Sequence, residues 1–151
     1  MIRYFYLNLL CLILILLVTA CDNNYTPDVD TNDNDVMIPT KVPVPDEFIG
    51  MVNPLGDTAQ VVEQGEIIYQ VNCASCHGVA GRGDGVAASP LEKKPNNLAK
   101  DQKDLSDAYL YWRIYAGGAF EPFRSMMPGW RSLLTEDDIW KIISYLRTLE
   151  G

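Results

Sequence analysis

The segment Cys73-Ala74-Ser75-Cys76-His77 decides how this chain folds. Two thiols separated by two residues can each form a thioether to a vinyl group of haem, and the adjacent imidazole can bind the iron. The segment therefore predicts one covalent haem c, attached through Cys73 and Cys76 and ligated by His77.

Zinc binding and dithiol redox chemistry are the alternatives for a Cys-x-x-Cys pair. Zinc sites usually take four protein ligands, but the chain has a single histidine and no second Cys/His cluster. A thioredoxin-like dithiol would need a βαβ pattern, and no strand-like alternation of apolar and polar residues flanks the pair. We therefore interpret the pair as a haem attachment site.

Residues 1–20 have the pattern of an export signal. Arg3 precedes an unbroken apolar run from Leu9 to Val18, which is short for a membrane span. The run ends in Val18-Thr19-Ala20-Cys21, which resembles the lipobox of bacterial lipoproteins, where the signal is cleaved before a cysteine that then carries lipid. An uncleaved membrane helix over residues 4–20 is the alternative. Both readings place the rest of the chain at the outer face of the cytoplasmic membrane.

Residues 21–56 are predicted to form a flexible tether. They are rich in Asp, Asn and Pro, and they hold seven acidic residues against one lysine in a chain of net charge −8. Such a composition buries too little apolar surface to repay ordering. From Val36 onward the tether is more apolar, so it either packs along a protein surface or serves as a spacer. Nucleic acid is excluded as a partner of an exported acidic chain.

Residues 57–151 are expected to form an all-α domain. A first helix begins at Asp57 or Thr58, either of which can cap it, and ends near Asn72. A second helix covers residues 106–116, and a third follows the N-cap Thr135.

One glycine predicts how two of these helices pack. Gly65 lies inside the first helix, where glycine costs about 1 kcal/mol relative to alanine. This cost favours a close crossing at Gly65 by the third helix, whose apolar stripe faces the core while Lys141 and Arg147 face water.

The order of these features resembles the class I monohaem bacterial cytochromes c, over about residues 57–149. The resemblance rests on Gly65-x-x-x-Tyr69, Gly78, Gly81, Gly83-Asp84-Gly85, Pro95-x-x-Leu98, Trp112, Met127-Pro128-Gly129-Trp130 and Tyr145. It implies the small cytochrome c fold, with helices wrapped around the haem and the first and last helices crossing.

The resemblance also implies an iron ligand set. His77 would bind through Nε2 and donate its Nδ1 hydrogen to a backbone carbonyl near Pro95. No other histidine exists, so the opposite face falls to Met, Lys, water or nothing. Met127 matches the Met-Pro ligand of the family, and the neighbouring Met126 is its rival.

Filled axial positions leave no room for a substrate, so the expected protein is an electron carrier and not an enzyme. Its redox partners would be a quinol-oxidising complex, a terminal oxidase or a photosynthetic reaction centre. The lipid on Cys21, the proline-rich lead and the single haem resemble the monohaem lipoprotein subunit of alternative complex III. This implies a subunit of a quinol-oxidising complex. A free tethered carrier is one alternative, and a five-coordinate gas sensor or peroxidase is another.

A local basic cluster allows two interpretations. Its members are Lys93, Lys94, Lys100 and Lys103. They form either a docking patch for an acidic partner or a solvated face, and steering requires that they share one surface.

Overall fold

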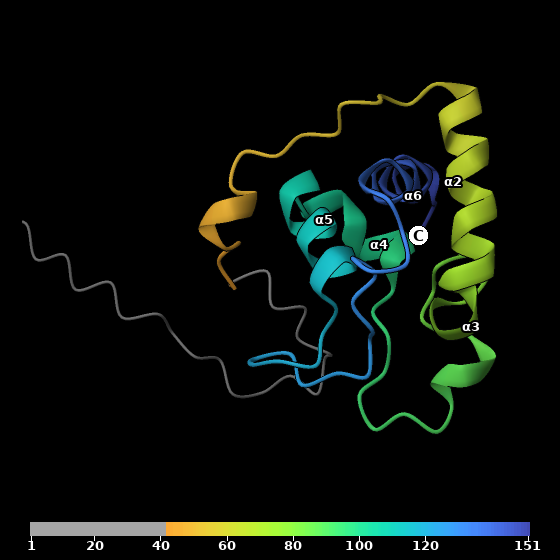
Figure 1. The fold of residues 1–151 in the computed structure, drawn as a ribbon. Helices are drawn as coiled ribbons and strands as arrows, with labels where there is room; N and C mark the ends of the chain where they lie inside the picture. The colour runs from red at the N-terminus through yellow and green to blue at the C-terminus, as the bar shows by residue number, and fades with distance from the viewer. Residues whose placement is uncertain (1–41) are drawn as a thin grey trace, which may run out of the picture. The chain divides into compact units, whose positions relative to one another are not determined.

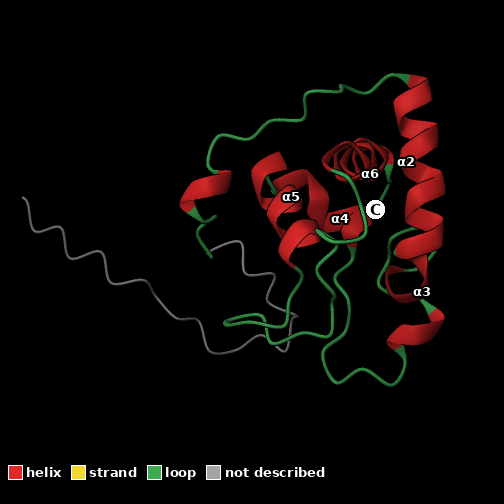
Figure 2. Cartoon of the chain, in the orientation of Figure 1, coloured by secondary structure: helices red, strands yellow, loops and turns green. Residues whose placement is uncertain are grey.

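The computed structural model describes residues 42–151. Within this range every regular element is a helix and no strand occurs, as Figure 2 shows. The elements in chain order are η1 (Asp46–Phe48), α2 (Ala59–Asn72), α3 (Ala74–His77), η2 (Val86–Ala88), α4 (Leu98–Asp101), η3 (Gln102–Asp104), α5 (Asp107–Ala116) and α6 (Glu136–Thr148), where η denotes a 3-10 helix. The predicted all-α fold class is confirmed.

Local capping defines the starts of the three longest helices. The Thr58 side chain accepts a hydrogen bond from a backbone amide at the start of α2, and Ser106 does the same for α5. At α6, Thr135 and Asp138 form a capping box, in which each side chain accepts from the backbone amide of the other. The three helices therefore begin where the sequence predicts.

The first and last helices cross at Gly65, as predicted. Figure 1 shows α6, seen nearly end-on, beside α2. A Cβ atom at Gly65 would lie 2.0 Å from the carbonyl oxygen of Lys141, so the two helices approach too closely for any side chain there. The rings of Tyr69 and Tyr145 pack nearby, with centroids 5.2 Å apart.

The apolar stripe of α6 forms the centre of the core. Its buried members include Ile139, Ile142, Ile143 and Leu146. The indole of Trp140, which the sequence did not assign to the core, is also buried and lies against Tyr111 of α5, with ring centroids 4.5 Å apart. The core thus joins α6 to α2 on one side and to α5 on the other (Figure 1).

Residues 42–56, which we call the N-terminal strap, pack on this core. Phe48 is 8% exposed, and its ring contacts those of Tyr111 and Tyr115. The side-chain amide of Asn53 donates to the backbone carbonyl of Trp140 and to the hydroxyl of Ser144. The packed domain therefore extends beyond the predicted start at residue 57, because the strap finds apolar and polar partners on α5 and α6.

The prediction that Arg147 faces water is wrong. Its guanidinium is partly buried and donates to the carbonyls of Gln102 and Leu105 and to the carboxylate of Asp107. These acceptors lie in η3 and at the start of α5, where carbonyls need donors at a helix junction. In residues 42–151, no helix has the length and apolar character required to cross a membrane.

Candidate functional site

The Cys-x-x-Cys-His segment folds as one helical turn. Cys73 ends α2 and begins α3, and the amide of His77 donates to the Cys73 carbonyl over 2.9 Å. Both cysteines are free and half-buried. Residues three apart on a helix lie on neighbouring parts of its surface, so both thiols can reach one planar group.

The cysteine environment is apolar. Burial, and then the neighbouring Cys76, raise the pKa of the Cys73 thiol to about 12. The thiol is therefore protonated at neutral pH in the unmodified chain. Two free, half-buried thiols next to a histidine suit thioether formation, whereas a redox dithiol is exposed and its thiolate is stabilised.

The glycine-rich loop 78–85 folds back onto this turn. The amide of Gly83 donates to the His77 carbonyl over 2.8 Å, and the amide of Gly85 donates to the Cys76 carbonyl. The Tyr69 hydroxyl donates to the carbonyl of Gly78, which has φ +81°. The loop therefore satisfies the carbonyl groups at the end of α3 and fixes the orientation of His77.

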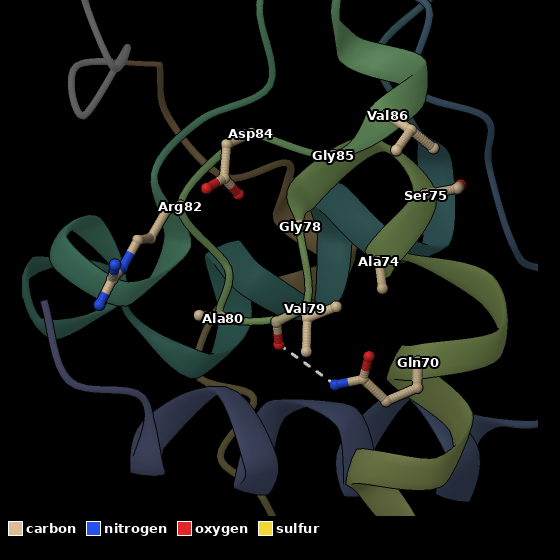
Figure 3. A pocket seen from close by; sticks show the side chains of 10 residues that line it. All are labelled: Gln70, Ala74, Ser75, Gly78, Val79, Ala80, Arg82, Asp84, Gly85 and Val86. Atoms are coloured by element: carbon tan, nitrogen blue, oxygen red, sulfur yellow. Dashed lines mark hydrogen bonds between the residues drawn. The ribbon is translucent and has the colours of Figure 1, made fainter.

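An open pocket of about 590 Å³ lies between this loop, the end of α2 and the start of α3. Figure 3 shows its lining, which includes the side chains of Val79 and Val86, and the Gln70 amide donating to the Val79 carbonyl. The lining includes neither Cys73 nor His77. The pocket is therefore lined by the end of α2, by α3 and by the loop, and not by the thiols or the imidazole.

The imidazole of His77 is held by the segment that follows η2. Its Nδ1 lies 3.3 Å from the carbonyl oxygen of Asn96, one residue after Pro95. Burial lowers the pKa of His77, and the contact with Asn96 opposes that effect in part. A neutral ring that donates from Nδ1 leaves the Nε2 lone pair free for a metal.

Met127 lies at a close contact between two backbone segments. Its carbonyl accepts from the amide of Gly118 over 2.9 Å. A Cβ atom at Gly117 would come within 2.5 Å of the Gly129 amide nitrogen, so only glycine fits where the chain passes α5. Met127 packs against the core, whereas Met126 is 78% exposed. Of the two methionines, Met127 is the one directed inward.

Arg113, which the sequence did not single out, lies among the aromatic rings of Trp112, Phe120 and Phe123. Its guanidinium carbon lies 3.4 Å from the centroid of the Phe123 ring, and its Nη1 is buried without a hydrogen-bond partner. Lys93 donates to the Phe123 carbonyl at the same place. Neither cation forms an ion pair with any residue in the described range. The only sequence signal was a cation beside Trp112 on a largely apolar helix.

The donor set fits haem c. Two free thiols, a neutral imidazole with a fixed Nδ1 and an inward methionine suit the attachment and ligation of haem iron. A buried donor without a partner calls for an acceptor, and haem carries two carboxylates. Cys21 and the predicted signal peptide lie outside the described residues, so these elements remain sequence predictions.

Comparisons with known proteins agree with this chemistry. The family described as cytochrome c oxidase, cbb3-type, subunit III matches residues 60–146. Cytochrome c55X of Paracoccus denitrificans is 37% identical over 97 residues, which cover 62% of this chain and 79% of that protein. The cbb3-type cytochrome c oxidase subunit CcoP of Cereibacter sphaeroides is 27% identical over 106 residues, covering 70% of this chain and 33% of that protein.

A solved structure shares the fold. A chain of the reducing HAO-like protein complex of Kuenenia stuttgartiensis gives a TM-score of 0.54 at 28% identity, over 73% of this chain and 50% of that chain. This chain spans about a third of the length of the CcoP relative. The family match nevertheless covers most of the domain that holds Cys73, Cys76 and His77. The chain belongs to the cbb3-type cytochrome c oxidase subunit III family, and it is a c-type cytochrome that carries covalently bound haem c.

Proposed function

We propose that Cys73 and Cys76 attach the haem, that His77 and Met127 ligate its iron, and that Arg113 donates to a haem carboxylate. The observation that carries this proposal is the free Cys-x-x-Cys pair beside an imidazole whose Nδ1 faces the Asn96 carbonyl. When bound, haem c supplies one-electron ferric/ferrous chemistry.

The groups around the proposed haem site would tune that chemistry. The carbonyl of Asn96 fixes the His77 tautomer and increases its basicity as a ligand. The Met127 thioether favours the reduced iron and so raises the potential. Trp112 and Phe123 are buried and form an aromatic wall that excludes water, which strengthens electrostatic effects on the iron. With both axial positions filled by protein, the domain acts as a carrier and not as an enzyme.

Two methionine variants test the ligand set. Met127→Ala is expected to open the sixth position, so that the ferrous protein binds carbon monoxide readily. Met126→Ala is the matched control, because its side chain is exposed and should leave binding at the low wild-type level. Strong binding by the wild-type protein would instead support a five-coordinate sensor or peroxidase.

We further propose that the chain works at the outer face of the cytoplasmic membrane, tethered through lipid on Cys21. The proposed parts are a signal peptide over 1–20, a lipidated tether over 21–56 and a haem domain over 57–151, onto which the strap packs. The lipobox-like Val18-Thr19-Ala20-Cys21 supports the anchor.

Its proposed role is that of an electron-transferring subunit of a respiratory membrane complex. The relative CcoP is a subunit of a cbb3-type oxidase, which favours a terminal oxidase as partner. The lipid anchor and the single haem segment favour a quinol-oxidising complex such as alternative complex III. Both readings require a domain held close to its partner.

Native electrophoresis tests membership of a complex. Membranes that contain the protein are solubilised in mild detergent, resolved on a native gel and stained for haem. Stoichiometric co-migration with an oxidase or a quinol-oxidising complex is expected. The identity of the co-migrating subunits shows which of the two complexes is the partner. Migration alone would contradict the subunit proposal and support a free tethered carrier. Cys21→Ser is the anchor control, because it should abolish the incorporation of labelled fatty acid into the protein.

A further inference from the structure

Two adjacent lysines make different contacts. The Nζ of Lys94 donates to the carbonyls of Ala88 and Ser89, within its own loop. The Nζ of Lys93 donates instead to the carbonyl of Phe123, which lies 30 residues further along the chain. Both lysines therefore make hydrogen bonds within the domain. The bonds of Lys94 stay within its own loop, whereas the bond of Lys93 connects two different loops.

The loop that carries Lys93 belongs to the His77 side of the site. It runs from η2 to α4 and includes Asn96, whose carbonyl faces the His77 Nδ1. The Pro95 carbonyl lies so close to Gly83 that a Cβ atom there would be 2.4 Å from the oxygen. This loop is therefore packed closely against the glycine-rich loop 78–85 that follows α3.

The loop that carries Phe123 belongs to the Met127 side. Gly118 bonds to Met127 through its amide and to Ser125 through its carbonyl, which closes the loop at its base. Phe123 is 5% exposed, and its ring packs against Trp112. The side chain of Phe123 is thus buried within this loop, and Met127 follows Phe123 four positions later in the sequence.

We propose that Lys93 is a positioning residue for Met127. Among the hydrogen bonds of residues 42–151, the bond from Lys93 to Phe123 is the one that joins the loop orienting His77 to the loop bearing Met127. It holds the loop that bears Met127 against the loop that orients His77, and so it would position Met127 as an iron ligand. The inference rests on the proposed ligation by Met127. Figure 1 shows the two loops on the same side of the domain, below α4 and α5.

The test measures access to the iron in the full-length ferric holoprotein. Lys93→Met removes the contact, and exogenous imidazole should then bind about tenfold more tightly, with a weaker near-infrared band from methionine ligation. Lys94→Met is the matched control and should behave as wild type, since its contacts stay within one loop. Lys93→Arg keeps a cationic donor and should restore most of the wild-type behaviour.

Equal imidazole binding by Lys93→Met and Lys94→Met would overturn the positioning role. A wild-type protein without the methionine band, unchanged by Met127→Ala, would overturn the ligand assignment instead, so the two failures are distinguishable. If Lys93→Met does not mature, Lys93→Gln and Lys94→Gln are compared by amide hydrogen exchange. Glutamine is uncharged and one bond shorter. Faster exchange of residues 118–127 in Lys93→Gln alone supports the proposal, and equal exchange overturns it.

Discussion

Arg113 has the only buried side-chain nitrogen or oxygen without a hydrogen-bond partner in residues 42–151. Burial lowers the pKa of its guanidinium, and the nearby Tyr109 opposes that effect. A cation kept in such a place is costly unless an anion joins it. The aromatic ring of Phe123 offsets part of the cost through a cation–π contact. The proposed haem carboxylate would supply the missing acceptor.

Arg113→Gln is expected to lower the reduction potential of the haem. Loss of a positive charge near the ring favours the ferric state, and a fall of about 60 mV corresponds to about tenfold in the one-electron equilibrium. Redox titration of the purified holoprotein measures this shift. Arg131→Gln is the control, because Arg131 is exposed and its loss should change the potential far less. Equal shifts in the two variants would remove Arg113 from the haem site.

Individual site residues differ in how far the sequence predicts them. Cys73, Cys76 and His77 lie within one segment of five residues, so their spacing alone indicates the chemistry. The acceptor for His77 could be narrowed only to the neighbourhood of Pro95, because the exact carbonyl depends on how the loop turns. Arg113 was missed because its burial arises from the loop that folds over it, and neither helical phase nor composition reveals that contact.

Among the larger elements, the N-terminal strap was the least predictable. Its prolines and acidic residues are typical of a flexible spacer, so its composition alone predicts no packing. Its packing depends on partners more than 50 residues away in the sequence. The backbone amide of Asn53 donates to the Asp107 carboxylate, and the Asn53 side chain donates to the Trp140 carbonyl. The helices α2 and α6 were predictable because Thr58 and Thr135 cap them locally. The short helix α3 has no side-chain cap, and α4, although Asn97 caps it, is too short to show an amphipathic pattern in the sequence. Both depend on the loops around them.

Phe48→Ala is expected to detach the strap from the domain. Phenylalanine is almost fully buried here, and its truncation costs about 3 kcal/mol in well-packed sites. Limited proteolysis of the full-length holoprotein should show faster cleavage within residues 42–56, while α2 and α6 stay resistant. Ile49→Ala is the control, because Ile49 is 66% exposed and its loss should not change the cleavage rate. Cleavage at the wild-type rate in Phe48→Ala would contradict the anchoring role.

The whole domain depends on one polar network that joins distant segments. Arg147 of α6 bonds to the carbonyls of Gln102 and Leu105 and to the carboxylate of Asp107, at the start of α5. The second carboxylate oxygen of Asp107 accepts from the backbone amide of Asn53 in the strap, over 3.0 Å. The strap, η3, α5 and α6 therefore share a single charged junction, and its protonation state bears on the stability of the domain as a unit.

Acid is expected to destabilise the domain through Asp107. Burial would raise the pKa of this carboxyl, but the hydrogen bonds from Arg147 and Asn53 outweigh burial and lower it. A lowered pKa in the folded state means that the contribution is present above the unfolded value of about 3.9 and is lost as the pH falls through the folded value. Asp107→Asn should cost about 1–3 kcal/mol at pH 7, because it weakens charge-assisted hydrogen bonds.

The measurement is denaturant unfolding of the holoprotein at a series of pH values, for the wild type and Asp107→Asn. Between about pH 5 and 2 the wild-type free energy of unfolding should fall more steeply, so that the two curves converge in acid. Other carboxylates with lowered pKa values, such as Asp138, are present in both proteins and cancel in the difference. Parallel curves would mean that the Asp107 junction contributes nothing to the acid response. Convergence would assign that part of the response to the bonds joining the strap, α5 and α6.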